Sequence, residues 1–281
     1  MKPFHYYEPS TLEEALDLLD RYGDRARVLA GGTDLVVQMK QKKTVPEAVI
    51  SLKRIPGLDG IEAGAAIRIG PLVSMTQVAA HPAFAGRLSL LRESALAVAD
   101  IQIRNAATVG GNIANASPSA DLSPSLLALG AKVTLRRKGG ERVVGLDAFC
   151  VGPFCTRLEG SELITEVSIS PVPGGGAYVW RPKKTTVDET LVGVAAWIRG
   201  DPANKTCVGA AVALGSVAPV PLRARKAEAF LQGKTLSLEI FRAAGEIAAE
   251  ETSPRSRADY RRTLVAVLTE EALERAWRRA Q

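Results

Sequence analysis

The chain has 281 residues, of which 46% are hydrophobic and 23% charged, and a net charge of +6 at pH 7, which suits a globular protein with two or three structural units. It lacks an apolar run of the roughly 18–20 residues that cross a bilayer and the apolar core of a signal peptide, so we expect a cytoplasmic protein without a membrane span. Three cysteines and two dispersed histidines exclude a protein-held iron–sulfur cluster or other metal site, so redox chemistry would need an organic cofactor or a partner's metals.

The first part of the chain predicts three strands that alternate with two helices. Ser10 or Thr11 can cap the first helix, with Glu13 or Glu14 completing a capping box, and Gly23 can end it. The expected strands cover 4–7, 27–30 and 48–52, and the second helix covers 35–40.

Pro56-Gly57 punctuates the chain and opens a second part. There we expect strands over 60–62, 66–70, 132–137, 142–144 and 162–169, with helices over 74–80, 88–99 and 123–129. The polar, glycine-bearing segment 104–121 is predicted as a half-buried loop that lines a pocket, although a surface loop rich in turn formers is the simpler interpretation.

The segment Pro171 to Gly176 is typical of a linker, and we expect a smaller α+β domain after it. Its strands should lie near 177–181, 192–199 and 206–216, and its helices near 223–231, 238–250 and 258–279. Many of the arginines lie here, interleaved with glutamates, which favours a solvated helix face or a subunit interface over nucleic-acid binding.

A strand that ends in two glycines is the first candidate for a binding site. The residues are Leu29, Ala30, Gly31, Gly32, Thr33, Asp34 and Leu35. Such a turn can present successive N–H groups and a helix N-terminus to a phosphate, and the Thr33 hydroxyl can donate as well. By itself the turn is more often structural, and it is neither a Rossmann fingerprint nor a Walker A sequence.

A second glycine pair lies about 80 residues further on. It belongs to a segment that contains Thr108, Val109, Gly110, Gly111, Asn112, Asn115, Ser117 and Asp121. Polar groups here alternate with apolar residues, and a carboxylate such as Asp121 suits the hydroxyls of a ribose or ribityl chain. Two phosphate-binding turns in one chain favour a flavin dinucleotide over a mononucleotide.

Taken together, the stretches Ala30-Gly-Gly-Thr-Asp-Leu35 and Ile103-Arg-Asn-Ala-Ala-Thr-Val-Gly-Gly-Asn-Ile113, with Asp121, resemble the FAD-binding medium subunits of the molybdenum hydroxylases. Phe4-x-Tyr-x-x-Pro9, Glu162–Val167 and the motif from Asp188 to Ala195 extend the resemblance to almost the whole chain. It implies an α+β fold. A two-part FAD-binding domain of the vanillyl-alcohol-oxidase (PCMH) type would cover 1–170, with subdomains of about 1–55 and 56–170, and a small α+β domain would cover 177–281.

The resemblance also implies roles for single residues. The stretches 30–35 and 108–112 would wrap the pyrophosphate of FAD, and Leu163 or Ile164 would lie near the isoalloxazine, with Ile101 also in the cofactor site. Arg181 stands where family members often carry a flavin-proximal lysine, so Arg181 or Lys183 would favour the anionic form of the reduced flavin, unless both belong to a solvated strand end. FAD would be the only redox cofactor, because the cysteine-rich insertion of some 4-hydroxybenzoyl-CoA reductase subunits is missing.

On this interpretation the chain has no catalytic residues of its own. It would relay electrons through FAD between the [2Fe–2S] clusters of a small subunit and an external acceptor, beside a molybdopterin-containing large subunit, in a dimer of heterotrimers. One rival is a free-standing flavin oxidase or dehydrogenase, which would need a covalent-flavin residue or a larger cap than the roughly 105 residues after the linker. The other is a basic interaction module without a cofactor.

Overall fold

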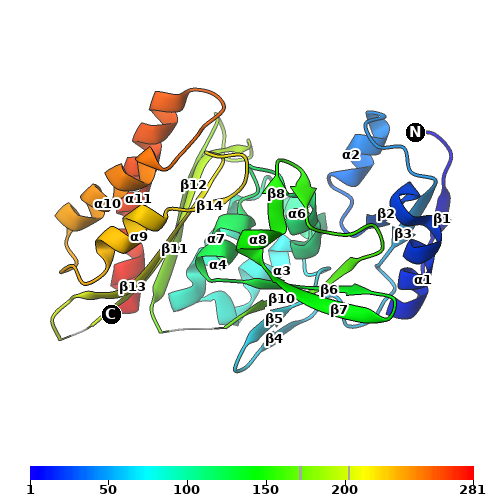
Figure 1. Ribbon diagram of the computed structural model, residues 1–281, viewed down its shortest axis with the longest axis horizontal. Helices are drawn as coiled ribbons and strands as arrows, with labels where there is room; N and C mark the ends of the chain where they lie inside the picture. Colours follow the sequence, from blue (N-terminus) through cyan, green and yellow to red (C-terminus); the bar gives the residue numbers. More distant parts are fainter. Residues whose placement is uncertain (171–172, 202) are drawn as a thin grey trace.

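A computed structural model describes residues 1–170, 173–201 and 203–281. Its elements form three sheet-centred layers along the long axis of the molecule, in the order in which the chain visits them (Figure 1). The first is a parallel sheet in the order β1 (His5–Tyr7), β3 (Ala48–Ser51), β2 (Ala26–Leu29). Two helices connect its strands, α1 (Leu12–Tyr22) and α2 (Leu35–Lys40).

The boundaries of α1 follow from local hydrogen bonding. The Thr11 hydroxyl accepts the Glu14 N–H at 3.2 Å, and the Glu14 carboxylate accepts the Ser10 N–H at 2.8 Å, so the predicted capping box is shared between two residues. Gly23, at φ 51°, ends the helix. The buried face of α1 packs on β3, which gives this part a small core of its own.

The middle layer is an antiparallel sheet in the order β4-β5-β10-β6-β7, covered by helices. The strands are β4 (Ile61–Ala63), β5 (Ile67–Ile69), β10 (Leu163–Ile169), β6 (Lys132–Arg137) and β7 (Gly140–Gly145), with the hairpin β8 (Cys150–Gly152) and β9 (Cys155–Thr156) beside it. The helices are α3 (Met75–Ala80), α4 (Ser89–Ala97), α5 (Ile101–Ala106), α6 (Val109–Asn115), α7 (Leu122–Ala128) and α8 (Leu146–Phe149), with short 3₁₀ turns at Pro82–Phe84 and Gly86–Leu88. A further 3₁₀ turn, Gly23–Arg25, follows α1 in the first layer.

The segment 104–121 is more helical than its composition indicates, because α5 and α6 both fall within or next to it. The Asp100 carboxylate caps α5 by accepting the Ile103 N–H at 2.8 Å, and the Thr108 hydroxyl caps α6 by accepting the Gly111 N–H at 3.1 Å. The first part of the expected loop is therefore helical, whereas 116–121 lies outside the helices and several of its residues line a cavity, as predicted. The helix predicted over 88–99 ends earlier, at Ala97, and Ala99 has a positive φ of 38°.

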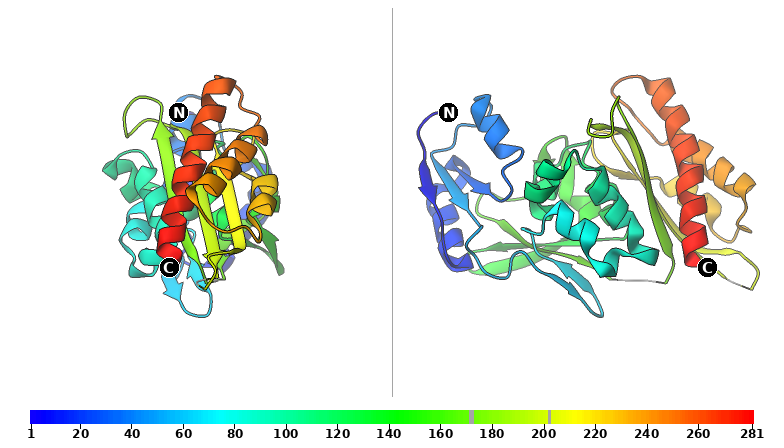
Figure 2. Two further views of the ribbon diagram at one scale, coloured as in Figure 1. Left: turned by 90° about the vertical axis from the view of Figure 1, so that its left-hand side faces the viewer. Right: turned by 180° about the vertical axis from the view of Figure 1, so that it is seen from behind.

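The third layer is an antiparallel sheet in the order β11-β12-β13-β14, with bounds β11 (Gly175–Pro182), β12 (Thr190–Gly200), β13 (Cys207–Gly215) and β14 (Leu222–Arg223). The helices α9 (Arg225–Leu231), α10 (Leu238–Glu250) and α11 (Ala258–Ala280) cover its outer side. Its inner side packs on α4 and α7, so the sheet lies between two helical layers (Figure 2).

The predicted linker is partly wrong. Residues 171 and 172 lie outside the described residues, but Gly175 and Gly176 belong to β11. A Cβ on Gly175 would lie 2.4 Å from the carbonyl oxygen of Ala276 in α11, and one on Gly176 would lie 2.6 Å from Leu90 in α4. These glycines therefore allow helices to pack closely on both sides of the strand, a long-range cause that the local sequence does not reveal.

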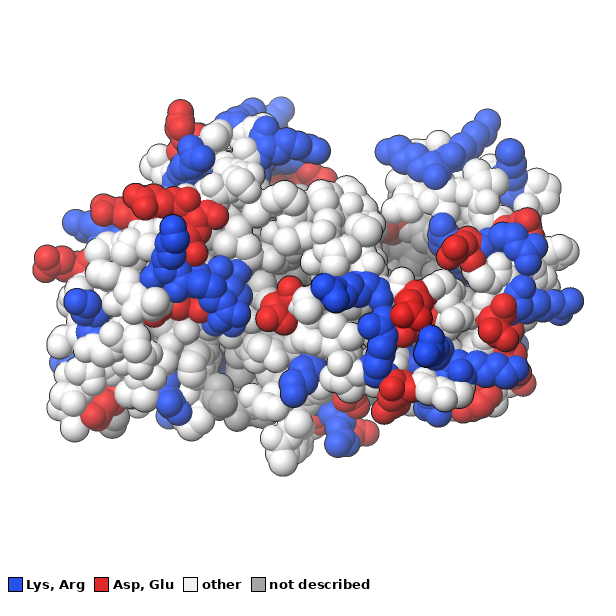
Figure 3. All heavy atoms as spheres, in the orientation of Figure 1, with Lys and Arg blue, Asp and Glu red and all other residues white. Residues whose placement is uncertain are grey.

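Charged side chains of both signs alternate over the surface (Figure 3). On α11, Arg275 pairs with Glu271 and Arg278 with Glu274, each one helical turn away. This arrangement is that of a solvated helix face, as the interleaved sequence predicts. Arg279 differs, because it reaches Glu93 on α4 at 2.5 Å and also donates to the Gly176 carbonyl at 2.7 Å.

We predict that the Glu93–Arg279 pair fastens the third layer to the middle one. Both side chains are mostly buried, and Glu93 also accepts the Tyr178 N–H at 2.8 Å, so Arg279→Met would leave a shielded carboxylate without its cation. The expected loss in the free energy of unfolding is about 2 kcal/mol, measured by urea denaturation. Arg278→Met, which breaks an exposed pair on the same helix, should change it by no more than about 0.5 kcal/mol. Equal losses in the two variants would contradict the prediction.

Candidate functional site

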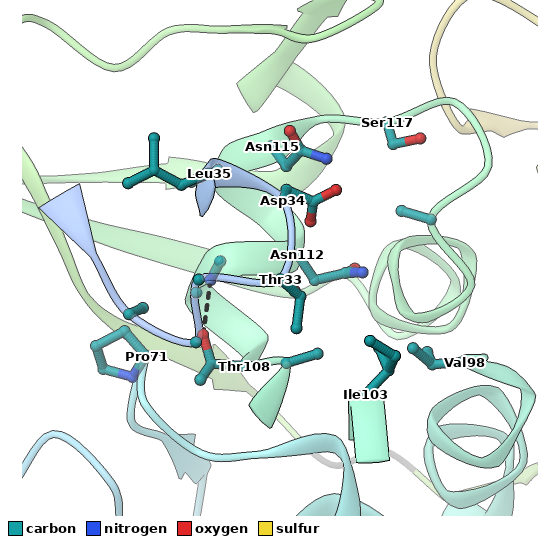
Figure 4. A pocket seen from close by; sticks show the side chains of 18 of the residues that line it. Thr33, Asp34, Leu35, Pro71, Val98, Ile103, Thr108, Asn112, Asn115 and Ser117 are labelled. Atoms are coloured by element: carbon teal, nitrogen blue, oxygen red, sulfur yellow. Dashed lines mark hydrogen bonds between the residues drawn. The ribbon is translucent and has the colours of Figure 1, made fainter. Parts of the chain in front are cut away.

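A cavity of about 550 Å³ lies between the first two layers and reaches the β11–β12 loop of the third (Figure 4). Most of the predicted site residues line it: Ala30, Gly31, Gly32, Thr33, Asp34, Leu35, Thr108, Gly110, Gly111, Asn112, Asn115, Ser117, Asp121, Leu163 and Ile164. The two glycine turns, 80 residues apart in sequence, thus form one wall of a single site.

Five predicted residues do not line the cavity. Val109 is fully buried in the core of the middle layer, and Leu29 is half-buried at the end of β2. Ile101 lies on the surface, with 54% of its area exposed, whereas Ile103 lines the cavity in its place. Arg181 and Lys183 are exposed at the end of β11, and Lys183 forms an ion pair with Glu189.

Residues outside the predicted set complete the wall. Val98, Ala99 and Ile103, from the α4–α5 corner, add an apolar end, and Val187, Asp188 and Glu189 close the cavity from the third layer. The rest are Val28, Gln38, Leu52, Pro71, Ala107, Ala114, Ser119, Ala120, Leu158 and Glu162. The motif that begins at Asp188 could have indicated that third-layer residues line the cavity. The sequence around Pro71 and Leu158 gives no such indication.

The backbone of the first glycine turn offers hydrogen-bond donors. Within the described residues, the N–H groups of 31–35 donate to no other group, while the chain resumes helical bonding with Val36 N–H to Gly32 at 3.1 Å. Orphan N–H groups at the start of a helix, together with the positive φ of 81° at Gly32, make an anion-binding nest. The turn is thus suited to a phosphate group.

The second glycine turn uses its N–H groups inside the chain. Val109 donates to Val73 and Gly110 to Pro71, both at 2.9 Å, while Gly111 and Asn112 donate to the Thr108 hydroxyl and carbonyl. What remains for a ligand is side chains: the Asn112 Oδ1 is buried and has no partner among the described groups. This turn therefore contributes its close packing and its amide rather than a second nest.

The charge of the cavity wall is negative. No lysine or arginine is among the described residues that line it, whereas Asp34, Asp121, Glu162, Asp188 and Glu189 are. Hydrogen bonds from Arg142 lower the pKa of Glu162, so that this carboxylate stays ionised, and burial raises the pKa of Asp34. Burial raises the pKa of Asp121 to about 6, although two hydroxyl donors oppose it.

Comparison with known proteins shows the family to which the chain belongs. Residues 2–172 match the family model described as the FAD binding domain in molybdopterin dehydrogenase, and residues 181–276 match that of the CO dehydrogenase flavoprotein C-terminal domain. The chain belongs to the FAD-binding medium subunits of the molybdenum hydroxylases. The expected fold, an FAD-binding domain followed by a C-terminal α+β domain, is confirmed, and FAD is the cofactor of this family.

Its relatives include the carbon monoxide dehydrogenase medium chain of Hydrogenophaga pseudoflava, 33% identical over 98% of both chains. A putative xanthine dehydrogenase FAD-binding subunit of Escherichia coli is 31% identical over 96% of this chain and 95% of its own. Among solved structures, a carbon monoxide dehydrogenase of H. pseudoflava superposes with a TM-score of 0.93 at 35% identity, covering 99% of both chains. Quinoline 2-oxidoreductase of Pseudomonas putida 86 gives 0.92 at 27% identity and covers 100% of this chain and 99% of its own.

The cavity fits a flavin dinucleotide. It has unpaired N–H donors for a pyrophosphate in the turn 31–35, a buried amide oxygen without a partner at Asn112, and an apolar end at Val98 and Ile103 for an aromatic ring. Within the described residues, no group of three or more His, Cys, Asp or Glu is placed to hold a metal ion. Among these same residues no helix has the length and apolar character of a membrane span.

We predict that the first glycine turn tolerates no side chain at Gly31. A Cβ there would lie 2.0 Å from the Ala106 carbonyl oxygen, so Gly31→Ala must push the turn away from the α5–α6 junction. The free energy of unfolding should fall by about 1–3 kcal/mol, and FAD should no longer be retained after desalting. Gly60→Ala is the matched control, because a Cβ at Gly60 meets nothing within 4 Å. Retention of FAD by Gly31→Ala would contradict the prediction.

We also predict a pH-dependent cost of burying Asp121 in the FAD-free protein. Its pKa rises from 3.8 to about 6 on folding, so the folded state holds the proton more tightly and loses stability as pH rises from about 4 to 6. Asp121→Asn cannot ionise, so it should gain up to about 3 kcal/mol over the native protein between pH 4 and 7.

Unfolding in urea at pH 4.5, 6 and 7.5 measures this difference. Asp188→Asn is the control of opposite sign, because backbone N–H donors lower the pKa of Asp188 and its ionised form therefore stabilises the fold above its ordinary pKa. A difference between Asp121→Asn and the native protein that stays constant with pH would refute the assignment.

Proposed function

We propose that the chain is the flavin subunit of a molybdenum-containing hydroxylase or dehydrogenase complex. The observation that carries the proposal is the cavity in which the glycine turn at 31–35 presents unused N–H groups. The relatives are named as medium chains or FAD-binding subunits of dehydrogenases, and the match covers nearly the full length of both partners. Substrate chemistry then takes place in another subunit, and this chain binds and orients the flavin.

The chain's residues divide the work of holding FAD. The N–H groups of 31–35 and the Thr33 hydroxyl bind the pyrophosphate, with Asn112, Asn115 and Ser117 beside them. Asp121 accepts a hydrogen bond from a hydroxyl of the ribityl chain or ribose, and Leu163 or Ile164 lies against the isoalloxazine. When bound, FAD supplies the ability to accept electrons singly and release them in pairs.

The partners follow from the cysteine count, because three cysteines are too few to hold an iron–sulfur cluster. A [2Fe–2S] small subunit delivers the electrons and a molybdopterin-containing large subunit carries out the substrate reaction, in a dimer of heterotrimers. We place the complex in the cytoplasm, in keeping with three free cysteines. We keep 1–170, divided near 55, as the FAD-binding unit, and extend the second unit, expected over 177–281, back to Gly175, where β11 begins.

The alternatives have less support. Both faces of the C-terminal sheet are covered, by α9 and α11 on one side and by α4 and α7 on the other, which argues against a substrate-cap domain of a free-standing oxidase. Arg275 and Arg278 of α11 pair with neighbouring glutamates, which argues against a basic interaction module.

We predict that the purified chain binds one FAD per molecule and keeps its visible flavin absorbance after desalting. Asn112→Leu removes the amide without changing the side-chain size greatly, and should weaken binding about tenfold by loss of a hydrogen bond to a charged group. Fluorescence titration measures the affinity, with Gly60→Ala as an unaffected control. A colourless protein, or one that binds nucleic acid in a salt-sensitive manner instead, would overturn the proposal.

A further inference from the structure

Asp121 is held in place from the third layer. The Tyr178 hydroxyl donates to Asp121 Oδ1 at 2.8 Å, and the Thr190 hydroxyl donates to the same oxygen at 2.5 Å. Asp121 stands at the N-cap of α7, where an aspartate commonly caps its own helix, yet its side chain makes no capping hydrogen bond. The carboxylate therefore forms hydrogen bonds with the C-terminal sheet rather than with its own helix.

Both donors are rigidly seated. Tyr178, on β11, is fully buried, and its ring crosses β12 at Gly193, where an added Cβ would lie 2.3 Å from the Tyr178 hydroxyl oxygen. Thr190 begins β12, and its carbonyl accepts the Ser216 hydroxyl at 2.8 Å. The Ser216 N–H in turn donates to the carbonyl of Pro118 at 2.8 Å, close to Asp121 in the chain. The sheet and the segment before α7 therefore form one hydrogen-bonded unit.

The second carboxylate oxygen remains for a ligand. Oδ2 of Asp121 accepts no hydrogen bond from the described residues, and Asp121 lines the cavity. We propose that Tyr178 and Thr190 are positioning residues for FAD: they occupy Oδ1 of Asp121, so that Oδ2 is fixed as an acceptor for a flavin hydroxyl. Retention of FAD in the first two layers then requires the C-terminal sheet. The inference rests on the proposed function.

The hydrogen bonds from Tyr178 and Thr190 to Asp121 should make FAD binding depend on pH. Burial raises the pKa of Asp121 to about 6, and the two hydroxyls, which stabilise the ionised form, oppose that rise. Loss of either hydroxyl raises the pKa of Asp121 further. The acceptor is then protonated, and its charge-assisted bond to the ligand lost, at a higher pH.

Other charged groups face the same space. Tyr178 has a pKa well above its ordinary value because of burial and stays neutral, while hydrogen bonds from Arg142 lower the pKa of Glu162 and backbone N–H donors lower that of Asp188. Glu189 is paired with Lys183, and Arg261 of α11 is bound to the carbonyls of Leu191 and Ser216. Among the described residues that line the cavity, Asp34 is the other carboxylate whose pKa burial raises, so its variant enters the test.

The test is FAD affinity of the full chain, measured by fluorescence from pH 5 to 8.5. The native protein should lose affinity below about pH 6, as Asp121 gains its proton. Thr190→Val and Tyr178→Phe should each weaken binding about tenfold at pH 7, the loss expected for a hydrogen bond to a charged group, and should move the midpoint to higher pH. Thr190→Ser keeps the hydroxyl and should therefore show the native affinity at pH 7 and the native pH midpoint. Asp121→Asn should bind FAD weakly, with an affinity that shows no transition between pH 5 and 8.5. Asp34→Asn should lose affinity at the same pH as the native protein.

Thr269→Val is the matched control for a buried threonine, because Thr269 lies in α11 with no hydrogen-bond partner among the described groups, and it should match the native protein. If Tyr178→Phe fails to fold, the Thr190→Val and Thr190→Ser pair decides. Native affinity and midpoint in Thr190→Val would overturn the inference, as would weaker binding with an unmoved midpoint, which indicates a merely structural role. A native protein that binds no FAD would instead refute the proposed function.

Discussion

The backbone contact between Gly31 and the α5–α6 junction is the constraint on which the site depends. Any side chain at Gly31 would occupy the position of the Ala106 carbonyl oxygen, so the strand-to-helix turn and the start of α6 can meet only through a glycine. The contact fixes the first layer against the second at one point. The space left beside it is the cavity, and the Gly31 side of the contact is the one whose N–H groups remain unused.

The two glycine pairs are therefore not equivalent, although the sequence presents them alike. Gly110 meets Pro71, where an added Cβ would lie 2.6 Å from the proline ring, and its N–H is already bonded to the Pro71 carbonyl. The pair at 110–111 is thus mainly a packing device, whereas the turn at 31–32 has the unused N–H groups that suit an anion. Because no lysine or arginine is among the described lining residues, a pyrophosphate bound at this turn would be held by backbone dipoles in a wall rich in carboxylates.

Local patterns predicted most of the elements, because caps and periodicity are local. The bounds of α2 and α10 follow from their apolar periodicity and flanking residues, and Thr11 and Gly23 mark the ends of α1. The motifs also led to about half of the cavity wall. The misses have non-local causes: β11 starts within the expected linker, since Gly175 lies under α11, and Lys183 turns to Glu189 rather than to the cavity. Ile101 and Ile103 differ only in which side of a six-residue helix they occupy, which the sequence alone does not resolve.

The C-terminal sheet is joined to the middle layer by two unlike contacts on one strand. At Tyr178 the backbone N–H binds Glu93, which Arg279 neutralises, while the side-chain hydroxyl binds Asp121 at the cavity. A single buried residue thus connects the ion pair that fastens the layers with the carboxylate of the site. Because both groups belong to one fully buried residue, a shift of the third layer must move the cavity wall as well. That coupling gives a physical reason for a flavin subunit to keep a second domain that, of its described residues, supplies only 187–189 to the cavity lining.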